Sequence, residues 1–506
     1  MSARERLLLP GPGERDQVPA PVSAVVAGGG LAGVAAAAAL AERGVSVVLA
    51  EREPFLGGRA GAWTDHLASG EPFEMERGFH AFFRQYYNLQ ALLRRIDPEL
   101  SFLEPLEDYP ILGPGGQVES FSGLPNTPPW NVVALTRRTP TLGLRDLMGV
   151  NGLAALEMLR YERHRTYGRH DDRTASQYLD SLRFPPDARR MLFDVFAHSF
   201  FNPEEAMSAG ELLMMFHFYF SGNPEGLIFD VSRRPFSKSI WGPLEAYLAG
   251  MGVDVRTRCS LSKISKGQEK RWSVLLDGKA AEADLVVLAL TVPGLQEVVA
   301  QSPELDDPGF RRSVKGLALT HPFAVWRLWL DRAPRPDRTP FVGTTGVGCL
   351  DNISLYHLFE DESRSWVDRH GGSVVELHAY AVDPGMSEAE VRADMMRAFH
   401  VFYPEFEGAG VIEERYLLRR DCPAFALNSY RDRPGVPTPH EGIALAGDFV
   451  RLPIPSALME RAVASGFLAA NHLLAPQGVR PEPIWSIPRR GLFGRRPVET
   501  AESRMR

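Results

Sequence analysis

The sequence feature that most constrains this chain is a glycine pattern, Gly-x-Gly-x-x-Gly, at residues 28–33. An apolar segment, 22–27, precedes the pattern, an alanine-rich segment, 34–43, follows it, and a second apolar segment covers 45–50. This order predicts a parallel βαβ unit. Without side chains at the turn, backbone N–H groups and the positive end of the helix can approach a pyrophosphate. The predicted dinucleotide-binding turn consists of Gly28, Gly30, Leu31, Ala32 and Gly33.

An acidic residue closes the second predicted strand. Glu51 lies at its end, where a carboxylate accepts hydrogen bonds from ribose hydroxyls and disfavours a 2′-phosphate. The pattern therefore predicts FAD or NAD rather than NADP. A Gly-Gly turn and an arginine follow at 57–59, which places a fixed cation beside the same diphosphate. The cofactor-binding residues predicted in this run are Glu51, Arg52, Gly58 and Arg59.

Later segments indicate how the chain is divided. Short apolar runs recur at 253–255, 272–276, 284–290 and 442–446, so the first domain is predicted to be discontinuous. Helical stretches dominate 105–235, while 315–425 contains two strand-like segments and a helix. The expected fold class is α/β, a doubly wound Rossmann-like cofactor domain with an inserted α+β substrate domain. The expected divisions are a mobile leader, 1–20; the cofactor domain, 22–105 with 236–314 and 426–475; the substrate domain, 106–235 with 315–425; and a tail, 477–506.

Composition excludes several functions. The chain has 56 basic and 63 acidic residues and no long basic run, which argues against nucleic acid as a partner. Its cysteines, Cys259, Cys349 and Cys422, are too far apart in sequence for a zinc knuckle or dithiol motif, which suggests a reducing cytoplasm. The first apolar run is too short for a signal peptide, so we expect no export. None of the 13 histidines forms a metal-binding motif, and we expect no metal site.

A closing motif extends the nucleotide-binding pattern. Gly447 and Asp448 follow the apolar segment 442–446 and precede a predicted helix. Together with Gly58 and Arg59, they resemble the FAD proteins of the amine oxidase and carotenoid desaturase superfamily. The resemblance implies FAD as the cofactor, with Gly58 and Arg59 on the flavin side of the dinucleotide. It also implies that Asp448 meets the ribityl chain or pyrophosphate and that the helix N-terminus faces the flavin ring.

The run Arg-Gly-Phe-His-Ala-Phe-Phe at 77–83 narrows the resemblance. With the stretches 108–110, 196–201 and 209–220, it is similar to the β-carotene desaturase/methyltransferases, also called isorenieratene synthases. The similarity covers about 22–475 and implies that the backbone at Gly78 lies against the isoalloxazine ring. The implied activity is FAD-dependent oxidation of the β-ionone rings of a carotenoid. A hydride leaves, one geminal methyl shifts to its neighbour, and proton loss with a second oxidation completes an aromatic ring, without a methyl donor.

An aromatic-rich segment, 193–229, lies within the predicted substrate domain. Ser208-x-x-Glu211 predicts a capping box, and the helix after it is apolar on all faces. Such a helix is either core or the wall of a tunnel for a long hydrocarbon. Because a carotenoid dissolves in lipid, we expect peripheral membrane contact near Phe200, Phe201 and 216–220.

Candidate catalytic residues are few. His80 is a titratable residue beside the predicted flavin loop, although a lone histidine is more often a core residue. The faces of nearby aromatic rings are candidates to stabilise a cation. These aromatic residues are Phe82, Phe83, Tyr86 and Tyr87.

Three alternatives remain open from the sequence. An acyclic carotenoid desaturase shares every flavin motif, and an amine oxidase would differ by polar recognition of its substrate. A non-catalytic, lipid-binding escort-type protein has the same fold. The electron acceptor is not indicated by any motif.

Overall fold

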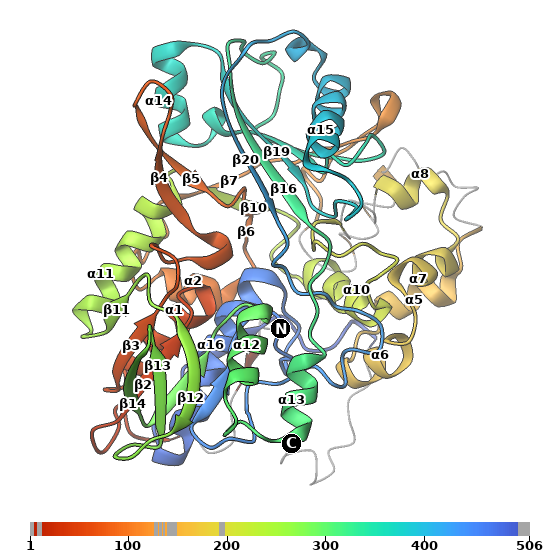
Figure 1. The fold of residues 1–506 in the computed structure, drawn as a ribbon. Helices are drawn as coiled ribbons and strands as arrows, with labels where there is room; N and C mark the ends of the chain where they lie inside the picture. The colour runs from red at the N-terminus through yellow and green to blue at the C-terminus, as the bar shows by residue number, and fades with distance from the viewer. Residues whose placement is uncertain are drawn as a thin grey trace.

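The cofactor-type half of the molecule is built on a parallel sheet of five strands (Figure 1). The computed structural model describes residues 5–7, 13–125, 130, 134, 137–138, 149–191 and 198–493. Two of its strands lie within residues 23–50 and another at 443–445, so the sheet joins distant parts of the chain, as the predicted discontinuous domain requires. In sheet order the strands are β11 (Asp254–Arg256), β3 (Ser46–Ala50), β2 (Ser23–Ala27), β15 (Leu285–Leu288) and β21 (Ile443–Leu445).

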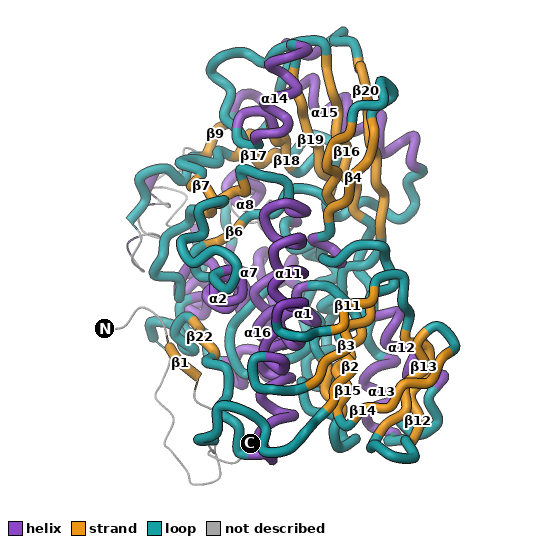
Figure 2. The backbone as a smooth tube through the Cα atoms, turned by 90° about the vertical axis from the view of Figure 1, so that its left-hand side faces the viewer, coloured by secondary structure: helices purple, strands orange, loops and turns teal. Residues whose placement is uncertain are grey.

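Two helices, α1 (Leu31–Ala41) and α16 (Leu458–Leu474), cross beside this sheet (Figure 2). Every residue of α1 is buried, because its alanines let the helix lie close to its neighbours. A Cβ atom on Gly466 of α16 would lie 2.2 Å from the carbonyl oxygen of Ala32. The two backbones therefore touch, and only glycine fits at position 466.

A second sheet of seven strands forms the upper half in Figure 1. Strand β16 (Phe323–Leu330) is buried along its length and pairs antiparallel with β19 (Ser373–Ala379) and β20 (Val411–Arg419). β17 (Phe341–Thr344) pairs parallel with β8 (Ile111–Leu112), which comes from the first insert. Strands of both predicted inserts thus share one sheet, while the domain boundaries themselves stay a prediction. The remaining strands of the sheet are β18 (Asn352–Leu355) and β9 (Val118–Glu119).

Smaller sheets and the other helices complete the fold. The remaining strands are β12 (Leu261–Lys266), β13 (Trp272–Leu276) and β14 (Lys279–Ala283) in one sheet; β6 (Phe82–Phe83), β10 (Phe229–Ser232) and β7 (Leu103–Pro105) in another; and the hairpin β4 (Ala62–His66) with β5 (Pro72–Glu76). The helices are α2 (Tyr87–Leu93), α5 (Gly152–Met158), α6 (Arg163–His170), α7 (Ala175–Leu182), α8 (Pro186–Arg189), α10 (Ala209–Phe216), α11 (Gly242–Gly250), α12 (Val292–Gln301), α13 (Pro308–Lys315), α14 (Asp361–His370) and α15 (Glu388–Phe402). Across the described ranges, no helix is long and apolar enough to cross a membrane.

The two chain ends differ from the expected irregular leader and tail. Strand β1 (Glu5–Leu7) pairs antiparallel with β22 (Ile484–Ser486), and Arg15 forms a bridge with Val479. Neither segment has the alternating pattern that predicts a strand. Each strand pairs only with the other, in a sheet of two strands. The rest of the predicted leader and tail, 1–4, 8–12 and 494–506, lies outside the described residues.

The predicted capping box at α10 is wrong. Ser208 does cap the helix, but its hydroxyl accepts from the N–H of Gly210. Glu211 turns instead into the core, where its carboxylate accepts hydrogen bonds from Arg433, Arg461 and the Tyr167 hydroxyl. Two buried guanidinium groups outcompete a backbone N–H for this carboxylate.

The predicted membrane-contact residues are largely buried, and only Phe201 and Phe220 among them are half-buried, so the structure does not support membrane contact through this segment. Phe200, Phe216 and Phe218 are 3%, 8% and 1% exposed, so they belong to the core. Phe196 and Ala197, the first residues of the predicted aromatic stretch, lie outside the described residues.

The buried cluster around Glu211 generates a stability prediction. Burial alone raises the pKa of Glu211, but the charges of Arg433 and Arg461 lower it to about 2, below its ordinary value of 4.5. Because the folded-state pKa is lowered, the stabilisation is present above pH 4.5 and is lost as the pH falls toward 2. Glu211→Gln leaves both guanidinium groups without a carboxylate and should lower the free energy of unfolding by about 3–5 kcal/mol at neutral pH.

Denaturant unfolding at several pH values measures this effect. The free energy of unfolding of Glu211→Gln should fall less than that of the wild type as the pH is lowered from 4.5 toward 2. Glu245→Gln, the same change at an exposed position of α11, is the control and should unfold as the wild type does. A Glu211→Gln protein as stable as the wild type at neutral pH would contradict the prediction.

Candidate functional site

One cavity of about 830 Å³ runs between the two sheets. The glycine turn, the end of β3 and the segment after β21 line one end of it. Aromatic side chains from the second half line the other end. A single space therefore connects the predicted nucleotide-binding loops with the predicted substrate domain.

Two glycine loops lie against each other at the first end. The N–H of Gly57 donates to the carbonyl of Gly29 (2.8 Å), and a Cβ on Gly58 would lie 3.3 Å from Cα of Gly30. Gly30 and Gly58 line the cavity, so its wall here is bare backbone. Gly28 also lines it and has φ +105°, a conformation that glycine adopts freely.

The third glycine of the turn has a different position. Gly33 is not among the cavity-lining residues, and its Cβ would lie 1.8 Å from the carbonyl oxygen of Gly28. It is therefore needed to close the turn. Leu31 and Ala32, by contrast, do line the cavity.

Glu51 is buried at the end of β3. Its carboxylate accepts hydrogen bonds from the N–H groups of Gly29 (2.6 Å) and Glu53 (2.8 Å) and also lines the cavity. Glu51 thus fixes the glycine turn while facing the space where a ribose would lie. Arg52 reaches the cavity at its rim, and its largely exposed side chain pairs with Glu53 (3.2 Å).

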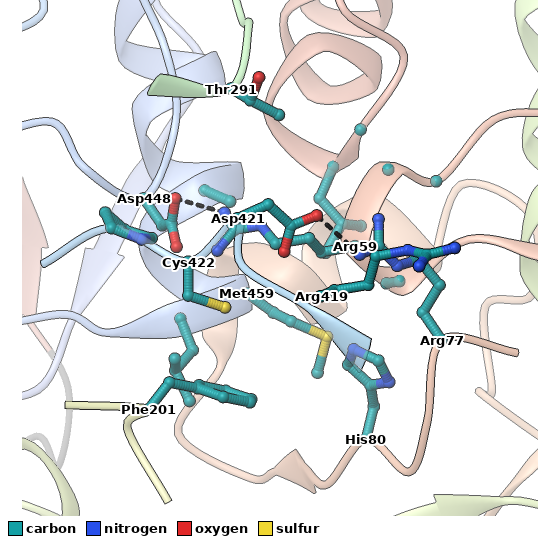
Figure 3. A pocket seen from close by; sticks show the side chains of 18 of the residues that line it. Arg59, Arg77, His80, Phe201, Thr291, Arg419, Asp421, Cys422, Asp448 and Met459 are labelled. Atoms are coloured by element: carbon teal, nitrogen blue, oxygen red, sulfur yellow. Dashed lines mark hydrogen bonds and ion pairs between the residues drawn. The ribbon is translucent and has the colours of Figure 1, made fainter. Parts of the chain in front are cut away.

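Arg59 and Asp448 form an ion pair across the cavity, with Nη2 and Oδ1 2.5 Å apart (Figure 3). Burial disfavours the charged guanidinium, but the neighbouring Asp448 raises the pKa of Arg59 above its ordinary value. Gly447, with φ +144°, donates its N–H to the Ser465 hydroxyl and so aims the next residue into the cavity. Residues 389 positions apart in sequence thus meet at one point.

Two helix N-termini open into the same end. The N-cap residues of α1 and α16 are Gly30 and Ala457, whose side chains have no hydrogen-bonding group. Leu31 and Leu458, the first residues of the two helices, line the cavity. The partial positive charge of both N-termini is thus available to an anionic or electron-rich group. Bare glycine backbone, the carboxylate of Glu51 and these N-termini together fit a dinucleotide.

His80 lines the cavity further along. Its Nδ1 contacts the carbonyl oxygen of Gly78 (2.7 Å), which assigns the proton to Nδ1 and leaves the lone pair on Nε2. Burial lowers the pKa of His80 to about 4, although the bond to Gly78 raises it. His80 is therefore a neutral imidazole at pH 7.

Gly78 is not a lining residue of the cavity. It has φ +112°, and its Cβ would lie 2.9 Å from Cε1 of His378. Position 78 thus has to be glycine because of close packing as well as backbone conformation. That its backbone lies against a flavin ring stays a prediction.

The second end of the cavity has an aromatic wall. The rings of Phe79 and Phe341 stack at 4.6 Å, and Phe229 packs edge-on to both. Tyr109 links Phe229 to Phe121. These residues all line the cavity and present hydrocarbon rather than charge.

Only part of the predicted aromatic set lies here. Of the four candidates to stabilise a cation, Phe83 and Tyr86 line the cavity, whereas Phe82 and Tyr87 do not. The apolar helix α10 is core along its length, and only the turn after it reaches the cavity, through Tyr219 and Phe220.

Sequence reasoning missed several polar lining residues. Arg77 pairs with Asp421 (2.6 Å), and His378 and Tyr380 lie at the end of β19. The sequence could have indicated the last two, because charged and polar residues at 376, 378 and 380 alternate along the predicted strand 374–382 and so fall on one face. Within the part of the chain that the structure describes, no group of three or more His, Cys, Asp or Glu residues could hold a metal ion.

Comparison with known proteins agrees with this geometry. Residues 31–474 match the family described as flavin containing amine oxidoreductase. The chain is 46% identical to a carotenoid phi-ring synthase of Streptomyces griseus, over 96% of this chain and 95% of that one. It is 27% identical to a carotenoid phi-ring synthase of Chlorobaculum tepidum, over 94% and 92%. A probable zeta-carotene desaturase of Synechococcus elongatus is 24% identical, over 90% and 99%.

Solved structures share the fold. Putrescine oxidase bound to putrescine superposes with a TM-score of 0.65 at 18% identity, over 90% of this chain and 99% of that one. Cyclohexylamine oxidase from Brevibacterium oxydans gives 0.65 at 14% identity, over the same shares. The chain is therefore a member of the flavin containing amine oxidoreductase family, an FAD-dependent oxidoreductase whose relatives include enzymes of carotenoid modification.

Proposed function

We propose that the protein oxidises the β-ionone rings of a carotenoid, β-carotene, to aromatic rings, with an intramolecular 1,2-methyl shift. The observation that carries the proposal is the single cavity that joins the glycine loops to an aromatic wall. A carotenoid hydrocarbon has no polar group to recognise, so its binding depends on burial of apolar area, at roughly 25 cal/mol per Å². The relatives named as phi-ring synthases agree with this substrate class.

The residues at the glycine end fit FAD. Gly28, Gly30, Leu31 and Ala32 would receive the diphosphate, and Glu51 the ribose. Gly58, Arg59, Gly447 and Asp448 would hold the ribityl side, with Arg52 at the rim. FAD supplies a two-electron oxidant that accepts hydride.

The protein's own part in ring chemistry is to exclude water and to favour positive charge in the substrate. When a ring carbon loses hydride, a cation is left, and the methyl shift follows within the substrate. The faces of Phe83 and Tyr86 would stabilise that cation, because aromatic quadrupoles attract positive charge. Neutral His80 adds no repelling charge.

The second candidate is an acyclic carotenoid desaturase. The similarity to a probable zeta-carotene desaturase favours it, since the same cavity would take a linear chain. Acyclic ends carry their two methyl groups on a double-bonded carbon, whereas a β-ring carries them on a saturated ring carbon from which one can shift, so substrate tests separate the two.

Membrane contact is part of the proposal, because the substrate resides in lipid. Leu153 and Phe493 are 79% and 55% exposed. Both lie beside α5. Leu153 is in its first turn, and the N–H of Phe493 donates to the carbonyl of Leu159, the C-cap of the helix. We propose that this pair, in place of the predicted residues near Phe200, touches the membrane surface without crossing it.

The cofactor site gives the first test. Glu51→Ala and Arg59→Ala should each weaken FAD retention by about ten- to hundredfold, because each removes charge-assisted hydrogen bonds of about 1.5–3 kcal/mol. FAD per protein, measured after dialysis, is the readout. Arg256→Ala, at an exposed ion pair of β11, is the control and should keep FAD. Full FAD occupancy in both site variants, with folding intact, would refute the assignment.

The substrate gives the second test. The purified protein should convert β-carotene to an aromatic product and leave lycopene and phytoene unchanged, because only a closed β-ring has geminal methyls beside the oxidised carbon. Methyl-labelled S-adenosylmethionine should leave no label in the product, since the methyl stays within the substrate. Conversion of phytoene to a more conjugated acyclic pigment would favour the desaturase, and label in the product would exclude the intramolecular shift.

Liposome flotation tests the membrane proposal. The double variant Leu153→Ser with Phe493→Ser should bind phospholipid vesicles at least about tenfold more weakly, because each large apolar side chain contributes about 1.5–3 kcal/mol when fully buried. The control is Val411→Ser with Ile412→Ser, two exposed apolar residues of β20, which should bind as the wild type does. Equal binding of the first variant and the wild type would count against this surface.

A further inference from the structure

A chain of polar groups reaches from the cavity into the core behind β19. Tyr380 and His378 line the cavity, and Glu376 lies beneath them, fully buried. Nε2 of His378 is 2.7 Å from a Glu376 oxygen, and Nδ1 is 3.1 Å from the Tyr380 hydroxyl. Two alternate positions of β19 and the residue that follows the strand thus form a tyrosine–histidine–carboxylate chain on one face.

Glu376 is held as a carboxylate by Arg327. The Nε of Arg327 donates to Glu376 (2.8 Å), and both residues are buried. Burial by itself raises the pKa of Glu376, but the charge of Arg327 and the bond to His378 lower it to about 2. Glu76, 4.0 Å from Arg327, has its pKa raised by burial to about 8 and is neutral at pH 7. The negative charge beside Arg327 therefore belongs to Glu376.

An ionised carboxylate fixes the tautomer of His378. At 2.7 Å from Glu376, Nε2 carries the proton and donates it, which leaves the lone pair on Nδ1. The Phe79 N–H also points at Nε2, at 3.3 Å, but a protonated Nε2 cannot accept it, and the shorter contact to the charged carboxylate decides the tautomer. Nδ1 then accepts from the Tyr380 hydroxyl, whose oxygen in turn accepts from the amide of Asn352 (2.5 Å). Every hydrogen in the chain thus points from the cavity toward Glu376.

We propose that Tyr380 and His378 are catalytic residues that accept the protons released by the oxidised ring, and that Glu376 is a positioning residue for them. This inference rests on the proposed function. When the substrate cation loses a proton, a C–H bond breaks and an O–H bond forms at Tyr380. The original O–H bond of Tyr380 breaks and an N–H bond forms at Nδ1 of His378. The imidazolium is stabilised by Glu376 and returns its proton to water before the next oxidation.

The geometry favours this chain over His80. Both histidines lie near Gly78, but the Nδ1 of His80 contacts only a backbone carbonyl, whereas His378 contacts a carboxylate that stabilises the charged ring. Tyr380 is held edge-on by Phe201 at 4.9 Å, which fixes its ring at the cavity wall. A rigid acceptor that can hold positive charge meets the requirement of proton loss from a cation.

The test measures how fast FAD-loaded protein converts β-carotene in phosphatidylcholine vesicles to aromatic product, with a quinone added as the two-electron acceptor that reoxidises the flavin between the two oxidations of each ring. Tyr380→Phe should slow aromatic product formation by about 10²–10⁴-fold while FAD content and unfolding midpoint stay unchanged. Tyr416→Phe, on strand β20 of the same sheet and not among the cavity-lining residues, is the matched control and should react as the wild type does. A Tyr380→Phe protein with the wild-type rate, or one that loses FAD, would overturn the proposal.

The positioning role of Glu376 has a spectroscopic readout. In ¹⁵N-histidine NMR spectra, His378 should be the Nε2–H tautomer in the wild type, with its signal assigned by its loss in His378→Asn. Glu376→Gln keeps the shape but removes the charge, and it should shift this tautomer signal and slow turnover. An unchanged signal and rate in Glu376→Gln would exclude the role. If His378→Asn does not fold, the reaction rate of Tyr380→Phe alone decides whether a proton relay through Tyr380 and His378 operates.

Failure of the relay can be distinguished from failure of the proposed function. If the wild type leaves β-carotene unchanged but oxidises an acyclic carotene, the ring chemistry is wrong. The relay is then tested on that substrate, because desaturation also releases a proton with each hydride. Slowed turnover by Tyr380→Phe supports the relay there, and a wild-type rate rejects it. If His80→Asn slows proton loss and Tyr380→Phe does not, the acceptor is His80 and the proposal fails.

Discussion

The structure depends on one backbone contact, between α1 and α16 where Gly466 meets the carbonyl of Ala32. A Cβ atom at either helix interface would push the two apart, since interiors have no room for an extra methyl group. Their close approach brings both N-termini to one cavity and carries Asp448 to Arg59. The cofactor end is therefore assembled by helix packing, and the glycine turn completes it.

The sequence predicted the cofactor half better than the other half. Gly28, Glu51 and Asp448 could be found because a dinucleotide requires particular residue types at fixed places on a βαβ unit. The relation between His378 and Glu376 could not be found in this way, because it depends on tertiary register between β16, β18 and β19. Glu211 shows the opposite failure: its local pattern matched a capping box, and a long-range ion pair decided its role instead.

The two ends of the cavity differ in polarity. At the glycine end, charges are paired or face helix N-termini, while the aromatic end offers hydrocarbon surfaces. Behind β19, Arg327 and Glu376 form a buried ion pair.

The position of β21 at the edge of the parallel sheet has a consequence for how the protein is made. Its neighbour in the sheet is β15, more than 150 residues earlier, and strand β1 pairs with β22 near the far end of the chain. During synthesis one face of α1 stays uncovered until α16 has left the ribosome, so the N-terminal βαβ unit cannot complete its packing before then. Such long-range closure slows folding, and FAD, held as proposed by residues from both ends of the chain, would then stabilise the closed form by mass action. Cofactor supply should therefore govern how much of this enzyme survives in the cell as well as how fast it works.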